Sequence, residues 1–269
     1  MAVTINGFTI TSLETIHAYN RTTGVCELYL DELQEATIEN SEDTQDITGK
    51  GDRLLKQIKK NKATTVTGTS ALICGDLMAA QTGSEVETPE GGVKVRKPDI
   101  LDVAKGAKNV KTTFKAVGET GAEISSLCIL TSNGALGKKF TQGAVASADE
   151  FTYDPTTQVI TLPTDIAKSG DLKIVAFYDY LADGSKVVNK SDIFGKTLRV
   201  YVDCIGTDVC DNEYKCQFVI PRGQFSGEFS ITMGGDQTVE EFTINTLVDT
   251  CQNSAAELFE FIVYQDAIV

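Results

Sequence analysis

Alternating apolar and polar positions recur in short segments along most of the chain. A period of two is typical of β-strands that bury one face in a core and leave the other face in solvent. Frequent threonine and only five prolines favour the same structure. The sequence therefore predicts a mainly β protein with strands at residues 25–30, 63–67, 113–117, 124–130, 150–153, 159–162, 172–178, 197–203, 214–220, 228–233, 239–246 and 258–264.

Two local signals stand out in the first third of the chain. Asn6-Gly7 lies inside the alternating segment 3–10, which predicts a tight hairpin. Residues 70–83 change to a helical period between Ser70 and Gly83, so we expect a helix of about three turns there. Its apolar residues, which should face a sheet, are Leu72, Ile73, Leu77 and Ala80.

The middle of the chain differs from its flanks. Strands alternate there with turn signals at Asn133-Gly134, Asp154-Pro155 and Asp183-Gly184. This spacing suits a small β-sandwich. We therefore expect residues 111–190 to be a β-rich domain inserted into a larger domain that residues 1–110 and 191–269 form.

The last predicted strand is apolar at nearly every position. Such a strand needs cover on both faces, so it lies inside the sheet or a neighbouring subunit covers it. We expect five of its side chains to close the sheet and the core: Leu258, Phe259, Phe261, Ile262 and Val263.

Charge is unevenly distributed along the chain. There are 38 acidic and 24 basic residues, a net charge of −14, which argues against a protein that wraps a polyanion. One stretch holds seven acids and no base: Asp31, Glu32, Glu35, Glu39, Glu42, Asp43 and Asp46. The next stretch holds one acid and six bases: Lys50, Arg53, Lys56, Lys59, Lys60 and Lys62. Beyond Arg222 the chain has eight acids and no base.

Two interpretations of the 31–62 segment are open at this point. Its two stretches are either solvated loops that flank a turn, or complementary patches through which the acidic stretch of one copy meets the basic stretch of the next. Opposite charges at two places on one molecule favour head-to-tail association, which produces rings or open stacks.

The residues contain no catalytic constellation. A single histidine excludes sites built on histidine pairs. Gly195-Lys196-Thr197 lacks the earlier glycine of a phosphate loop, and nothing near His17 would orient it as a base beside Cys26. A hydrolase with paired carboxylates is the remaining enzymatic alternative. We expect no catalytic residue, no cofactor and no bound metal.

Several further features concern the compartment in which the chain is made. The seven cysteines are scattered, and the N-terminus has neither a basic nor an apolar leader region. No apolar run approaches eighteen residues. We therefore expect free thiols, synthesis in a reducing cytoplasm and no membrane span.

Five segments near the two ends of the chain share patterns of strand, glycine and charge with one known group. They are residues 46–70, 72–81, 218–231, 235–237 and 258–264. Together they resemble the major tail tube proteins of long-tailed bacteriophages. The middle segment 111–190 is similar to the small β-domains that virion proteins often carry as insertions.

This resemblance implies a tail-tube-like β-sandwich with a flanking helix, assembled into hexameric rings. The rings would stack head to tail into a hollow tube whose inner sheets surround the lumen. Genomic DNA would pass through during ejection without specific binding. In this family a long loop between early strands often reaches the neighbouring ring, and residues 31–62 occupy a comparable place.

The resemblance also implies the partners and the location. The partners would be other copies of the chain and tail proteins of the tape-measure, initiator and terminator types. The location would be the virion tail, after assembly in the host cytoplasm. A second hypothesis stays open beside it: a capsid decoration or adhesin module that binds its ligand through residues 111–190.

Overall fold

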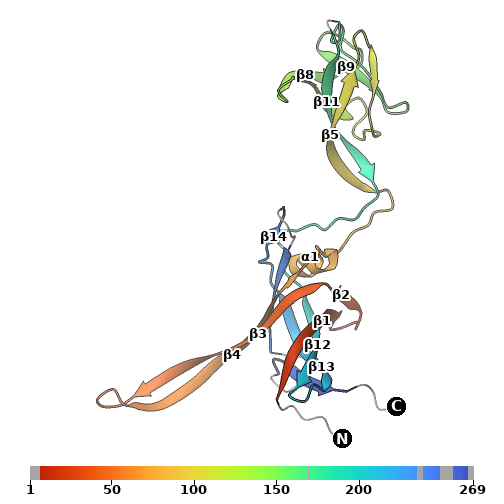
Figure 1. Ribbon diagram of the computed structural model, residues 1–269. Coiled ribbons are helices and arrows are strands. Elements are labelled where there is room, and N and C mark those ends of the chain that lie inside the picture. The colour runs from red at the N-terminus through yellow and green to blue at the C-terminus, as the bar shows by residue number, and fades with distance from the viewer. Residues whose placement is uncertain (1–6, 169, 235–238, 249–256, 266–269) are drawn as a thin grey trace. The chain divides into compact units, whose positions relative to one another are not determined.

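The computed structural model describes residues 7–168, 170–234, 239–248 and 257–265. The described chain is mainly β, with one short helix, and this confirms the expected fold class. It divides into two compact units, Met1–Val86 with Val187–Val269, and Glu87–Lys186. We call the first the tube unit, because it contains the five segments that resemble tail tube proteins, and the second the inserted unit (Figure 1).

The tube unit contains a sheet of nine strands in the described part of the chain. Seven of them follow the order β2-β1-β12-β13-β15-β4-β3, while β14 pairs with β15 and β16 pairs with β13. The strands are β1 (Phe8–Asn20), β2 (Cys26–Leu30), β3 (Leu33–Thr48), β4 (Leu54–Ser70), β12 (Thr197–Asp208), β13 (Glu213–Phe225), β14 (Ile231–Thr232), β15 (Val239–Thr246) and β16 (Glu260–Tyr264).

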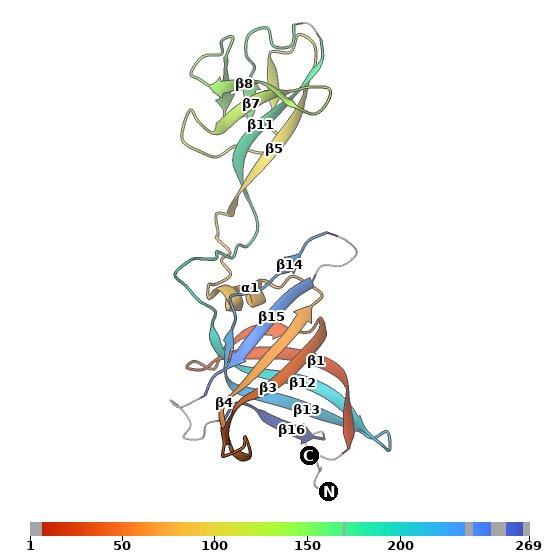
Figure 2. The ribbon, with the colours of Figure 1, turned by 90° about the vertical axis from the view of Figure 1, so that its left-hand side faces the viewer.

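This sheet bends over so that its two halves face one another across a core. Figure 2 shows β15, β4 and β3 crossing in front of β1, β12 and β13. The buried cluster takes alternate residues from both layers, such as Ile16, Val200 and Ile244, as the period of two requires. β13 joins the layers, because its residues 215–219 pair with β16 and its residues 223–225 pair with β15.

Helix α1 (Gly75–Thr82) is shorter than the sequence predicts. Its end at Gly83 is confirmed, since Gly83 has the left-handed φ of 73° that favours glycine after a helix. Leu77 and Ala80 are buried in the core, also as predicted. The prediction for Leu72 and Ile73 was wrong: both precede the helix and are 60% and 51% exposed. Ser70 belongs to β4, whose ladder with β15 extends to that residue.

The inserted unit is a second sheet, of seven strands in the order β5-β11-β7-β8-β9-β10-β6. β5 and β6, at its two edges, lie in contact, so the sheet curls around its own buried cluster. The strands are β5 (Val93–Val103), β6 (Asn109–Lys111), β7 (Ile124–Leu130), β8 (Leu136–Gln142), β9 (Glu150–Asp154), β10 (Val159–Thr161) and β11 (Leu172–Ala182).

Segment 113–117 is not a strand, contrary to the prediction. Side chains accept hydrogen bonds from three of its backbone N–H groups, and Val117 N donates to a strand, at the Asp179 carbonyl 2.8 Å away. Thr113 N donates to Asp99 Oδ2 at 2.8 Å, and Phe114 N donates to the Tyr178 hydroxyl at 3.1 Å. Ala116 N donates to the hydroxyl of Tyr153 at 2.9 Å. Buried side chains from three strands thus provide hydrogen-bond acceptors for backbone N–H groups of this segment, which is irregular although its sequence alternates like that of a strand.

Other strand predictions differ mainly in extent. The predicted segment 63–67 is the end of a strand that begins at Leu54, and the segment 228–233 contains only the two residues of β14. β3, β5, β6 and β8 were not predicted, nor was the part of β1 after residue 10. The proposed hairpin at residues 3–10 lies largely outside the described residues.

The two chain segments that lead into the inserted unit pair with each other. Glu87 N donates to the Lys186 carbonyl and Lys186 N donates to the Glu87 carbonyl, each at 2.9 Å. Their side chains form an ion pair at 2.9 Å. The chain therefore leaves the tube unit and returns to it through neighbouring residues.

Candidate assembly surfaces

Most of the charged residues predicted at the surface lie on one β-hairpin. β3 and β4 pair with each other throughout, but only residues 65–70 of β4 also pair with β15. Beyond that point the hairpin has no further strand beside it in the described chain, and Figure 1 shows it leading away from the rest of the tube unit. We call residues 41–62 the arm. Eight residues of strand correspond to a length of about 25 Å.

The acidic and basic stretches face each other within the same copy. They form the two strands of the arm, with Asp43 opposite Lys60 and Ile47 opposite Lys56. Lys59 forms an ion pair with Glu42. Three further hydrogen bonds cross the arm: Lys60 Nζ to Gln45 at 3.0 Å, Asn61 Nδ2 to Asp43 at 2.9 Å, and Gln57 Nε2 to Asp46 at 3.0 Å.

The other predicted charged residues lie at the two ends of the hairpin. Asp31 and Glu32 connect β2 to β3, and Glu32 accepts a backbone hydrogen bond from Ala71 at 3.0 Å. Glu35 and Glu39 follow on β3 beside the sheet, and all four side chains are exposed. Toward the turn, three bases have no ion-pair partner among the described residues: Lys50, Arg53 and Lys56.

Exposed apolar side chains gather at the far end of the arm, and the sequence analysis missed them. They are Ile47, Leu54, Leu55 and Ile58, which are 40%, 58%, 63% and 39% exposed. We call these four residues with the turn between them the arm tip. The signal was present in the sequence, since Leu54 and Leu55 interrupt a run of bases. Exposed apolar groups gathered in one place are typical of interaction sites.

The five residues that were predicted to close the sheet and the core, between positions 258 and 263, lie in β16 or directly before it. β16 pairs with β13 through Phe261–Phe218 and Val263–Cys216. The ring of Phe261 stacks on Phe218 with centroids 4.3 Å apart, and on Phe8 at 5.9 Å. Phe259 packs against the buried cluster of the tube unit. Leu258 and Ile262 are half-buried, and Ile262 lies opposite Gln217 on the other face of the sheet.

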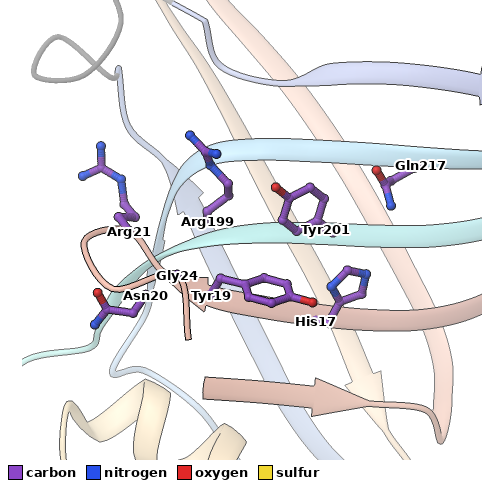
Figure 3. Close-up of a pocket in the computed structure, with 8 residues that line it drawn as sticks. All are labelled: His17, Tyr19, Asn20, Arg21, Gly24, Arg199, Tyr201 and Gln217. Atoms are coloured by element: carbon purple, nitrogen blue, oxygen red, sulfur yellow. The ribbon is translucent and has the colours of Figure 1, made fainter. Parts of the chain in front are cut away.

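One pocket lies on the outer face of β1, β12 and β13, and Figure 3 shows the side chains that line it. His17 stacks on Tyr201 with ring centroids 5.1 Å apart, and Tyr19 meets both rings edge-on. Asp203 accepts hydrogen bonds from Thr15, His17 and Gln217 at 2.9, 2.8 and 2.7 Å. Nε2 of the histidine thus donates to a carboxylate within an aromatic platform.

A second hollow, of about 530 Å³, lies beside the end of α1. We call it the α1 hollow; its lining includes Gln81, Ile193, Phe194, Gln224, Glu228 and Asn245. The loop on one side is fixed by a hydrogen bond from Lys196 N to the Ala80 carbonyl at 2.8 Å. Gly83 makes this approach possible, since a Cβ there would collide with the Phe194 carbonyl.

Within residues 7–168, 170–234, 239–248 and 257–265, no group of three histidine, cysteine, aspartate or glutamate side chains is placed to hold a metal ion. In the same residues no helix has the length and apolar character that crossing a membrane requires.

Comparison with protein-family models matches residues 8–261 to the YomU/Tube protein family. A search of curated proteins found no match. The family match covers nearly the whole chain, including the inserted unit and both sides of the tube unit. The chain therefore belongs to the YomU/Tube family of phage tail tube proteins and is a structural protein of the virion tail, not an enzyme.

Proposed function

We propose that this chain assembles into rings, six copies to a ring, and that the rings stack head to tail into a tube that conducts genomic DNA. Membership of the tube family gives the structural role. The ring number and the DNA passage come from the resemblance described above. Assembly would take place in the host cytoplasm, with tape-measure, initiator and terminator proteins as further partners.

The free-standing arm is the observation that carries this proposal. An isolated two-stranded hairpin is marginally stable in water, because neither face is covered. Every residue of the arm except Gly49 is exposed. A hairpin of this length gains stability if a second copy covers part of it. We therefore propose that the arm contacts the neighbouring ring, through the acidic and basic residues named above and through its apolar tip.

The distribution of charge supports a conduit for DNA. The inserted unit holds 13 acids and 12 bases, which leaves 25 acids and 12 bases in the tube unit. Nearly all the net negative charge thus belongs to the part that would form the wall. Like charges prevent adhesion of a polyanion, so DNA would pass along such a wall without being held.

Electron microscopy of the purified protein over a range of concentrations tests the proposal. We expect hollow tubes or stacked rings, with or without an initiating tail complex as a seed. Protein that stays monomeric with and without the seed would contradict it. Six-fold class averages of single rings would test the ring number separately.

The inserted unit keeps a second candidate function open. It has its own buried cluster and its own sheet, as an independent binding module would. We infer that such a module would bind a capsid or a cell-surface ligand. A protease-resistant fragment of residues 87–186 that binds cells or capsids would support this role, and a fragment that binds neither would exclude it.

A further inference from the structure

We propose that the arm tip of one copy inserts into the α1 hollow of a second copy. This inference rests on the proposed tube assembly and identifies the receptor for the arm. It depends on two surfaces of the tube unit that have complementary shape and chemistry.

The arm tip is a convex surface with an apolar and a basic component. Leu54 and Leu55 are both more than half exposed, next to the turn. The turn region also carries Lys50, Arg53 and Lys56 against one acid, Asp52. Toward the body of the unit, in contrast, charges are paired across the arm. The tip is therefore the part of the arm whose groups remain available for another molecule.

The α1 hollow is concave and offers groups that match the tip. Phe194 and Ile193 both line the hollow, and Phe194 is 78% exposed. Gln81 is fully buried: its Nε2 donates to the Glu241 carbonyl at 2.8 Å, while its Oε1 has no partner among the described residues. An incoming N–H donor would satisfy that oxygen, and the exposed ring would gain apolar cover.

The charge of its lining distinguishes this hollow from the pocket of Figure 3. The lining of the α1 hollow contains one acid, Glu228, and one base, Lys190, so its charges balance. The pocket of Figure 3 is instead lined by Arg21 and Arg199 and would repel a basic tip. Like charges disfavour the encounter of a basic tip with that pocket, and the balanced lining of the α1 hollow does not oppose it.

A copy does not fill its own hollow, because Figure 1 shows the arm directed away from α1. A projection and a matching hollow at two different places on one unit make a heterologous contact. Contacts of this kind repeat from copy to copy and produce rings or stacks. The geometry therefore agrees with the growth of a tube by addition of identical units.

Cross-linking between two differently tagged copies tests the contact. One copy carries Leu54→Cys and the other carries Phe194→Cys, each with Cys26, Cys210 and Cys251 replaced by serine. The two copies are mixed, assembled into tubes and oxidised. We expect a disulfide-linked pair that contains both tags. The matched control replaces the hollow variant by Arg199→Cys, in the pocket of Figure 3, and should give at least tenfold less of the linked pair.

A second measurement does not depend on cysteine chemistry. Phe194→Asp should raise the protein concentration needed for tube growth at least tenfold, whereas Val145→Asp, at an exposed site in the inserted unit, should change it less than twofold. Tubes that form with no 54–194 cross-link and with normal growth of Phe194→Asp would overturn the receptor assignment and leave the tube function intact. Failure of the unmodified protein to form rings or tubes would contradict the tube function itself.

Discussion

At the scale of single residues, buried polar groups hold irregular parts of this fold in place. Glu240 is fully buried on β15 and accepts a hydrogen bond from the Cys74 N–H, at the start of α1, at 2.8 Å. Its other oxygen has no partner among the described residues. Burial therefore raises the pKa of Glu240 above its usual value.

This raised pKa predicts a specific pH dependence. A carboxyl whose pKa is higher in the folded state does not change the free energy of unfolding at pH values below its unfolded pKa, near 4.5. As the pH rises above that value the free energy of unfolding falls, because the unfolded chain ionises more readily. Glu240→Gln keeps the acceptor for Cys74 N and removes the ionisation. We expect the variant to be as stable as the wild type at pH 4 and more stable at pH 7, as measured by urea unfolding. An equal difference at both pH values would contradict this role.

Tyr178 supplies a second prediction at this scale. Its hydroxyl donates to Asp99 at 2.6 Å and accepts from Phe114 N at 3.1 Å, all inside the inserted unit. Tyr178→Phe removes one donor to the Asp99 carboxylate and the acceptor of Phe114 N. We therefore expect a loss of about 1–3 kcal/mol in the free energy of unfolding. Calorimetry should show a lower unfolding temperature for the inserted unit, with Tyr29→Phe, at an exposed tyrosine, as the control.

At the scale of secondary structure, the hairpin of β3 and β4 is the element that we connect with assembly. Its charged residues contribute little to folding, because exposed ion pairs are worth about 0–1 kcal/mol. The same residues would be buried in part if a second copy covers the arm. Folding and assembly should therefore respond differently to changes in the arm.

Reversal of charge in the arm separates these two effects. Replacing Lys56, Lys59 and Lys60 by glutamate puts like charges opposite Glu42 and Asp43. We expect far-UV circular dichroism to stay unchanged, because surface changes usually alter stability by about 0.5 kcal/mol, and tube growth to fall strongly. The exchange of Glu42→Lys with Lys59→Glu keeps the pair and serves as the control. Normal tube yield from the triple variant would remove these lysines from the interface.

The C-terminal strand gives a contrasting prediction, in which folding itself is affected. β16 covers Phe218 with Phe259 and Phe261. Phe261→Ala should destabilise the tube unit by roughly 2 kcal/mol, less than a fully buried phenylalanine would cost. Deletion of residues 258–269 should leave insoluble protein. If the truncated protein is soluble and assembles normally, this strand is dispensable.

At the scale of the whole molecule, the two units can be separated experimentally. Glu87 and Lys186 pair directly, so a short Gly-Ser linker between residues 86 and 187 should replace the inserted unit without strain. We expect this shortened protein to fold and to form tubes, because all of the arm and the α1 hollow remain. Thermal unfolding and electron microscopy are the measurements, and an unfolded product would show that the inserted unit supports the tube unit.

The sequence by itself determined the features that depend on local pattern. Alternation predicted the mainly β class, Gly83 marked the end of the helix, and the lack of a second histidine excluded whole classes of site. The two charged stretches were also visible, because each is continuous in the chain. These properties follow from neighbouring residues, so no knowledge of distant contacts was needed.

Only the tertiary structure decided which segments meet. The acidic and basic stretches pair with each other in one hairpin. Segment 113–117 is irregular, because the side chains of Asp99, Tyr178 and Tyr153 accept hydrogen bonds from its backbone. Leu72 precedes the helix and is exposed. The gathering of Ile47 and Ile58 with Leu54 and Leu55 at the arm tip, and the hollow beside α1, are likewise visible only in the folded chain. The physical reason is that burial and hydrogen-bond pairing depend on contacts between residues far apart in sequence, and alternation alone does not specify those contacts.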